Sequence, residues 1–141
     1  NKFLPPNADV RFGAGIRRIM SEYTSVNKKG IAISMGKNIE ARIPDEDIGD
    51  DVLTVPWQGI GMVIRDKYMP EYQAIKNFGG NHLFKMPVTS DLSYEYMILG
   101  AWSFGDVNNN EKEFVKYVDD EALIYNNPPI ITVHKFETKS K

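Results

Sequence analysis

The chain has no cysteine, no surplus of positive charge and no long apolar run, and each absence excludes a class of protein. Without cysteine, the protein has no disulfides, no thiolate nucleophile and no cysteine-bound zinc. Its 17 Lys and Arg residues face 19 Asp and Glu residues, a net charge of −2, so it lacks the basic surplus that neutralises nucleic-acid phosphates. No apolar run approaches the ~20 residues of a transmembrane helix. We therefore expect no nucleic-acid partner and no membrane span.

What remains is the composition of an ordinary globular domain. The 141 residues, 42% hydrophobic and 26% charged, suffice for one hydrophobic core. The first residue is Asn rather than Met, so we expect a processed, trimmed or cut chain. Residues 1–8 contain Pro5 and Pro6 and predict a linker from something upstream. Residues 9–141 then form a single domain or a portion of one.

The strongest pattern lies in Leu92–Gly105, where large residues alternate with smaller ones. Alternation with a period of two is typical of a β-strand, whose side chains point to opposite faces. The middle of the segment is apolar on both faces, so we expect a long central strand with a bulge at Gly100. One predicted face carries six large residues: Leu92, Tyr94, Tyr96, Ile98, Trp102 and Phe104.

A second predicted strand, Asn81–Met86, comes just before this segment, separated by the short turn at residues 87–91. Two strands joined by a short turn are typical of an antiparallel hairpin. Its register matters because a slip of one residue turns every side chain to the other face. The preferred register pairs aromatic residues and opposite charges: Phe84 with Tyr94, His82 with Tyr96, and Lys85 diagonally with Glu95.

The rest of the chain indicates a mainly β protein, an antiparallel β-sandwich with one C-terminal α-helix over residues 110–125. Asn110, with Glu113 three residues later, predicts the N-terminal cap of that helix. Residues 17–23 fit either a short helix or a strand, and residues 70–80 read as a polar loop. The other expected strands are Asp9–Ile16, Ile31–Met35, Val52–Tyr68 (one kinked strand or a pair) and Ile130–Phe136.

Two short segments resemble ligand loops, but each has a simpler explanation. The expected loop Ile39–Asp51 holds five acidic residues, which suit either a solvated loop or calcium, although their spacing does not fit the helix–loop–helix calcium motif. Gly13-x-Gly15 lacks the third glycine of a dinucleotide loop, so close strand packing is the favoured interpretation. We therefore expect no metal and no cofactor. The five acidic residues are Asp45, Glu46, Asp47, Asp50 and Asp51.

The candidate chemistry rests on His82, one of only two histidines. A near-neutral pKa suits imidazole to general acid–base catalysis, and the alternative is a strand-edge histidine bonded to backbone. The second histidine, His134, lies beside the polar tail and is the weaker candidate. The aromatic residues Tyr94, Tyr96 and Trp102 fit either the core or a platform for sugar rings. Arg11 and Arg65 fit either surface ion pairs or a clamp for the carboxylate of a uronic acid.

The last third carries four motifs in a fixed order: a histidine strand, an aromatic strand ending in Ala-Trp, a helix with Glu-Phe, and Asn-Pro. They are Asn81–Lys85, Tyr94–Trp102, Lys112–Tyr117 and Asn126–Pro128. This order resembles an uncharacterised bacterial domain family from polysaccharide-utilisation proteins, and residues 9–16 resemble an earlier strand of that family. The family is itself similar to the galactose-mutarotase-like supersandwich, whose concave face binds sugars. Its members are much longer, so this chain would be their C-terminal portion.

The resemblance implies a periplasmic or secreted carbohydrate-active protein acting on acidic oligosaccharides. Family members occur beside unsaturated-glucuronyl hydrolases and polysaccharide lyases, which suggests a lyase, dehydratase or hydrolase. Of the family's expected site residues, only His82 lies at a matching position. The partners would be an oligosaccharide and either the missing N-terminal part or a second chain. Three hypotheses therefore stay open: an enzyme, a non-catalytic carbohydrate-binding module, and a structural or interaction domain.

Overall fold

The computed structural model describes residues 9–43, 51–76, 80–88 and 93–133, with the backbone alone at residues 41–43 and 51–53. The described elements are strands, one short 3₁₀ helix and one α-helix. No helix among them is long and apolar enough to cross a membrane. In chain order they are β1 (Arg11–Arg17), β2 (Glu22–Lys28), β3 (Ile31–Ile43), β4 (Asp51–Ile64), η1 (Asp66–Tyr68), β5 (Glu71–Ile75), β6 (Asn81–Pro87), β7 (Tyr96–Trp102) and α1 (Glu111–Asn126).

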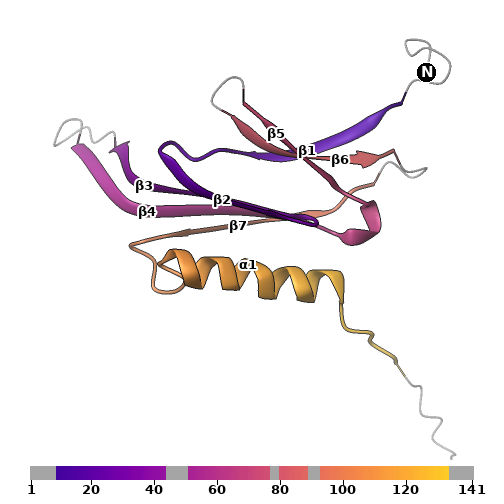
Figure 1. Ribbon diagram of the computed structural model, residues 1–141. Coiled ribbons are helices and arrows are strands. Elements are labelled where there is room, and N and C mark those ends of the chain that lie inside the picture. The colour runs from indigo at the N-terminus through magenta and orange to yellow at the C-terminus, as the bar shows by residue number, and fades with distance from the viewer. Residues whose placement is uncertain (1–8, 44–50, 77–79, 89–92, 134–141) are drawn as a thin grey trace, which may run out of the picture.

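The strands form two antiparallel sheets, and the helix covers one of them. The larger sheet has the order β2-β3-β4-β7 and the smaller has the order β1-β6-β5. Figure 1 shows the smaller sheet on one side of the larger sheet and α1 on the other. The prediction of a mainly β antiparallel sandwich with one C-terminal helix is therefore confirmed.

Strands β3 and β4 form the centre of the molecule because both of their faces are covered. Along β3, Ile33 and Met35 belong to the apolar cluster beneath α1, whereas Ala32 belongs to the cluster between the sheets. Along β4, Val63 belongs to the cluster beneath α1 and Met62 belongs to the cluster between the sheets. This is the near-continuous apolar sequence that a strand buried on both faces requires.

The helix lies close to the sheet because β4 carries glycine where α1 crosses it. A Cβ atom at Gly59 would lie 2.6 Å from the ring of Phe114, and one at Gly61 would lie 3.0 Å from Val118. The ring of Phe114 also meets Trp57 edge-on, with 5.7 Å between centroids. Both helix residues are fully buried, so these glycines allow close packing and are not turn residues.

Asn110 caps the helix as the sequence predicts. Its backbone is extended and its Oδ1 accepts a hydrogen bond from the Glu113 backbone N–H at 3.1 Å. The first turn carries Glu111 and Glu113, whose charges suit the positive end of a helix. The helix therefore begins where local sequence signals place it.

The expected central strand and its hairpin are both wrong. Strand β7 covers only Tyr96–Trp102 and lies at the edge of the larger sheet, paired with β4. Strand β6 pairs with β1 and β5 in the other sheet, so His82 lies opposite Ile16 and Ala74 and not opposite Tyr96. The two strands therefore belong to different layers. The sequence did not reveal this, because alternation records which faces of a strand are apolar and not which strand is its neighbour. The expected bulge is also absent, since Gly100 pairs in register with Ile60.

Other boundaries differ for related reasons. The expected loop at 70–80 contains the edge strand β5, and Ile39–Ile43 continues β3 instead of starting a loop. Residues 18–21 form neither helix nor strand, and Ser21 has a φ of 60°. Residues 130–133 are not in a strand, while residues 134–136 of the expected last strand and residues 44–50 of the acidic loop lie outside the described residues. Polar edge strands lack the apolar alternation on which their recognition depends.

Candidate functional site

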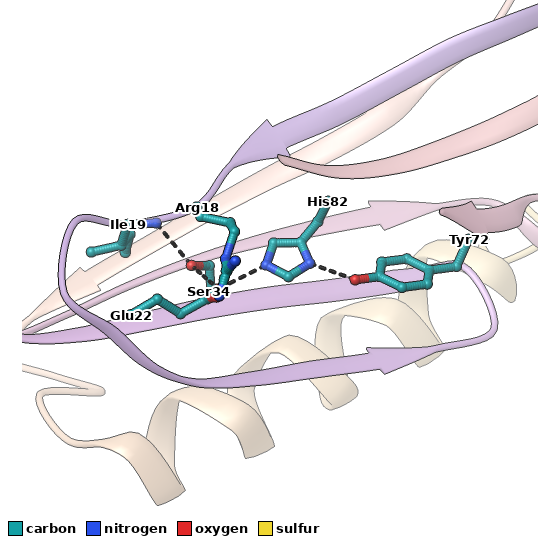
Figure 2. A network of polar contacts seen from close by, with 6 residues as sticks. All are labelled: Arg18, Ile19, Glu22, Ser34, Tyr72 and His82. Atoms are coloured by element: carbon teal, nitrogen blue, oxygen red, sulfur yellow. Dashed lines mark hydrogen bonds and ion pairs between the residues drawn. The ribbon is translucent and has the colours of Figure 1, made fainter. Parts of the chain in front are cut away.

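His82 lies in a buried polar network between the two sheets (Figure 2). Only 3% of the residue is exposed. Its Nδ1 lies 2.7 Å from the hydroxyl of Tyr72 on β5, and its Nε2 lies 2.7 Å from Oε1 of Glu22 on β2. The imidazole thus joins the three-stranded sheet, which carries both rings, to the four-stranded sheet, which carries the carboxylate.

Glu22 is the centre of this network. Its Oε1 accepts a 2.6 Å hydrogen bond from the hydroxyl of Ser34, and its Oε2 forms an ion pair with Arg18. The Ser34 hydroxyl in turn accepts a hydrogen bond from the Ile19 backbone N–H at 2.9 Å. Burial raises the pKa of Glu22, but the hydrogen bonds from Ser34, His82 and Arg18 outweigh it, so the pKa lies below the ordinary 4.5. The carboxylate is therefore ionised at neutral pH.

An ionised Glu22 decides how the protons are arranged along the network. A carboxylate can only accept, so Nε2 of His82 must carry the hydrogen that points at it. In the neutral imidazole, Nδ1 is then an acceptor and the Tyr72 hydroxyl donates to it. Burial, and then the charge of Glu22, raise the pKa of Tyr72, which keeps the phenol protonated. Tyrosine, imidazole and carboxylate thus form one directed hydrogen-bond chain.

A cavity of about 640 Å³ lies beside the carboxylate end of this chain. Its walls come from the connection between β1 and β2, which bends at Ser21. Two of the lining residues are arginines, and the carboxylate of Glu22 neutralises part of their charge. Neither His82 nor Tyr72 lines the cavity. The lining residues are Arg17, Arg18, Ile19, Met20, Ser21 and Glu22.

Tyr94 is a packing residue and does not join His82. Its ring stacks on Phe12, with 4.3 Å between centroids and 3° between planes, and it also contacts Tyr68 at 5.4 Å. Its hydroxyl donates a 2.8 Å hydrogen bond to the Pro87 carbonyl. Of the two roles that the sequence left open for Tyr94, core packing or a platform for sugar rings, these contacts fit core packing.

Four large side chains, Tyr96, Ile98, Trp102 and Phe104, form what we call the aromatic surface. Each is about half exposed, between 46% and 52%. Leu99 of β7 packs beneath α1, so alternation turns Tyr96, Ile98 and Trp102 to the opposite face of the sheet. Phe104 follows the strand and meets Trp102 edge-on at 5.7 Å.

The aromatic surface contains a hollow of about 300 Å³. Gly100 leaves it open, since a Cβ atom there would find only the Gly59 carbonyl oxygen, 3.9 Å away. Ile98 and Trp102 lie on either side of this glycine along the strand, while Ile60 and Gln58 line the hollow from β4. The hollow is thus apolar at its walls, with one amide side chain within reach.

The two candidate arginines lie elsewhere and are already paired. Arg11 contacts Asp9 at 2.9 Å and Glu71 at 3.8 Å. Arg65 lies 3.4 Å from Glu95, and its guanidinium carbon lies 4.4 Å above the ring of Tyr125. His134 lies outside the described residues. The structure therefore does not bring His82, the candidate tyrosines and the two arginines together, and the arginines form the surface ion pairs that the sequence left as one alternative.

Sequence reasoning missed Glu22, Tyr72, Ser34 and Arg18. Glu22 and His82 are 60 residues apart, and Tyr72 belongs to a strand that the sequence does not reveal. The only local signal is a glutamate in a segment of uncertain structure. Among the described residues, no three His, Asp or Glu side chains are grouped so that they could hold a metal ion.

Comparisons with known proteins add no relative. No family model matches the chain, and neither a curated protein nor a solved structure matches it.

Proposed function

We propose that this chain belongs to a carbohydrate-active protein and that it binds oligosaccharide on the aromatic surface of β7. One observation supports the proposal: Tyr96, Trp102 and Phe104 stand half exposed together on and just after one strand. Large aromatic rings normally find cover in the core, and a gathered exposed set marks an interaction surface.

The chemistry of the surface suits a sugar. Aromatic rings cover the apolar C–H faces of a pyranose, and the Tyr96 hydroxyl and the Gln58 amide can orient its hydroxyl groups. The hollow over Gly100 gives a substituent room beside the Trp102 ring. Tyr94 is not part of this surface, because its ring and hydroxyl are engaged in packing.

Tryptophan fluorescence tests the proposal directly. Trp57 is 6% exposed and Trp102 is 46% exposed, so a bound sugar should change the emission of Trp102. Titration with a panel of neutral and acidic plant and algal oligosaccharides should give saturable binding. Trp102→Ala should weaken that binding at least about tenfold, the loss of roughly 1.4 kcal/mol of contact energy. Leu123→Ala, at an exposed position on α1, is the matched control and should bind as the native chain does.

An absence of saturable binding across the panel would refute the proposal. So would an unchanged dissociation constant for Trp102→Ala, measured by calorimetry so that the missing fluorophore plays no part.

A catalytic contribution is the second candidate, favoured by the chain from Tyr72 through His82 to Glu22. When a carboxylate accepts the hydrogen of one imidazole nitrogen, the other nitrogen is an acceptor and can take a proton from a hydroxyl group. The hydroxyl here belongs to Tyr72, which would accept a proton from a sugar hydroxyl group while it passes its own proton to Nδ1 of His82, so that the phenol is never left ionised. Arg17 and Arg18 line the cavity at the Glu22 end of this chain and suit the carboxylates of an acidic oligosaccharide, whereas Tyr72 stands at the other end of the chain.

Tyr72→Phe tests the catalytic candidate because it removes one hydroxyl group and keeps the ring. Product formation from acidic oligosaccharides should fall at least a hundredfold, the usual scale for loss of a general base. Tyr23→Phe, which also removes a partly buried hydroxyl, is the control. Unchanged turnover in Tyr72→Phe, or no turnover by the native chain, would leave binding alone as the function.

A further inference from the structure

The segment after the helix leaves three β-branched side chains uncovered. Ile130, Ile131 and Val133 are 95%, 83% and 84% exposed. With Thr132 they form an uncharged run of residues that favour strands, yet none of the four lies in a strand. A short run of this composition is typical of a strand that pairs only when a sheet edge is offered to it.

Strand β7 offers such an edge. It pairs with β4 on one side, and no described strand pairs with its other side. Its two faces are both apolar near the edge, with Ile98 on the exposed face and Leu99 beneath the helix. An added strand that is apolar at alternate positions on both of its faces would extend both layers. In residues 130–133, Ile131 and Val133 would share one face, and Ile130 and Thr132 would share the other.

We propose that the protein forms a dimer in which the segment Ile130–Val133 of each copy adds as a strand to β7 of the other. The exchange is reciprocal, as a twofold interface requires. The proposal does not rest on sugar binding, because its evidence is the backbone edge of β7, with which no described strand pairs, and the exposed segment after the helix.

The direction of the segment favours a second copy over the same chain. The helix ends beside η1, where the Asn126 side chain accepts a 2.8 Å hydrogen bond from the Asp66 backbone N–H. Pro128 and Pro129 follow, and two consecutive prolines hold a chain extended. In Figure 1 the coloured part of the chain after α1, residues 127–133, runs away from both sheets. Because the fixed φ of the two prolines limits how the segment can turn back toward its own sheet, a second copy is the favoured partner.

Sedimentation over a range of concentrations tests the oligomeric state. The native chain should show a reversible monomer–dimer equilibrium. A chain ending at Pro129 should remain monomeric over the same range, while one ending at Phe136 should dimerise like the native chain. A native chain that is monomeric at every concentration, or a truncated chain that still dimerises, would overturn the proposal.

Cross-linking tests the contact itself, and the absence of native cysteine makes it unambiguous. Chains carrying Ile98→Cys are mixed with chains carrying Ile131→Cys and treated with a short bis-maleimide. The proposal predicts a cross-linked pair containing one chain of each kind. Met20→Cys, at a position 72% exposed in the turn between β1 and β2, replaces Ile98→Cys in the control and should give no product. Equal cross-linking from both mixtures would contradict the contact.

Discussion

At the scale of single residues, the polar network between the two sheets explains why a histidine and a glutamate lie inside a small β-sandwich. His82 and Glu22 come from different sheets, and both are almost completely buried. Buried polar groups are tolerated where each has its partners, and here the hydroxyl groups of Ser34 and Tyr72 supply them. The network therefore fixes how the two sheets sit on each other, whatever its chemical role.

Replacing His82 by alanine should destabilise the protein by about 2–6 kcal/mol. The change leaves the Glu22 carboxylate and the Tyr72 hydroxyl each without one buried partner, and unsatisfied groups of this kind cost about 1–3 kcal/mol each. Urea denaturation measures the difference. Gln73→Ala, at an exposed position on β5, should stay within about 0.5 kcal/mol of the native chain. A His82→Ala protein as stable as the native one would show that the network does not hold the sheets.

The network should also make the protein sensitive to acid. The pKa of Glu22 is lower in the folded chain than its ordinary 4.5, so folding favours the ionised form. The corresponding stability is present above pH 4.5 and is lost as the pH falls through the lowered value. Arg18, His82 and Tyr72 are the titratable groups that face this carboxylate.

Glu22→Gln isolates this effect. The variant should be less stable than the native chain at pH 7, because an amide does not pair with Arg18. This difference in stability should narrow as the pH falls below 4.5, where Glu22 becomes protonated first in the unfolded chain and then, at its lowered pKa, in the folded chain. Free energies of unfolding at pH 7, 4.5 and 3 measure it, and a gap independent of pH would contradict the ionised network.

At the scale of elements, the helix depends on its first residue. Asn110→Ala removes the side-chain acceptor for the Glu113 N–H and should cost about 1 kcal/mol. Asn109→Ala is a close control, because Asn109 makes only weak contacts of 3.4 and 3.5 Å. Thermal unfolding followed by circular dichroism compares the two. Equal melting temperatures for both variants would show that the cap contributes nothing.

The contact between helix and sheet depends on Gly59. Gly59→Ala places a methyl group 2.6 Å from the Phe114 ring, so α1 must move, and the variant should lose about 1–3 kcal/mol. Gly100→Ala is the matched change on the neighbouring strand. Its methyl group meets only the Gly59 carbonyl oxygen, at an ordinary contact distance of 3.9 Å, so stability should hold or rise by about 0.5–1 kcal/mol. Urea denaturation measures the free energy of unfolding of both variants. A loss in Gly59→Ala alone shows that crowding against Phe114, and not the general effect of replacing a strand glycine, lowers stability.

At the scale of the whole molecule, stability should decrease from the centre of the larger sheet toward its edges and toward the smaller sheet. Strands β3 and β4 are paired on both sides and covered on both faces, whereas β1 and β5 are the edges of the smaller sheet. Hydrogen exchange should therefore be slowest at Ile33, Met62 and Val63 and faster along β5. Equal protection of β5 and β3 would contradict this order.

Local sequence predicted those features that depend on near neighbours. The cap at Asn110 and the helix after it follow from residues three and four positions apart. The alternation around Ile98 and Trp102 correctly assigned one strand and the residues that share its face. Alternation along the expected strands, together with the cap signal and helical spacing after Asn110, was enough to predict a β-sandwich with a terminal helix.

Only the tertiary structure decided which strands are neighbours and which polar groups meet. Strand β7 reads as central because both of its faces are apolar, yet it lies at an edge, with one face beneath α1 and the other open. His82 could not be matched to Glu22 and Tyr72 from sequence, because contacts across 60 residues leave no periodic signal. Periodicity records how each side chain is buried relative to its own strand, whereas pairing depends on the packing of whole layers, and that is decided when the chain folds.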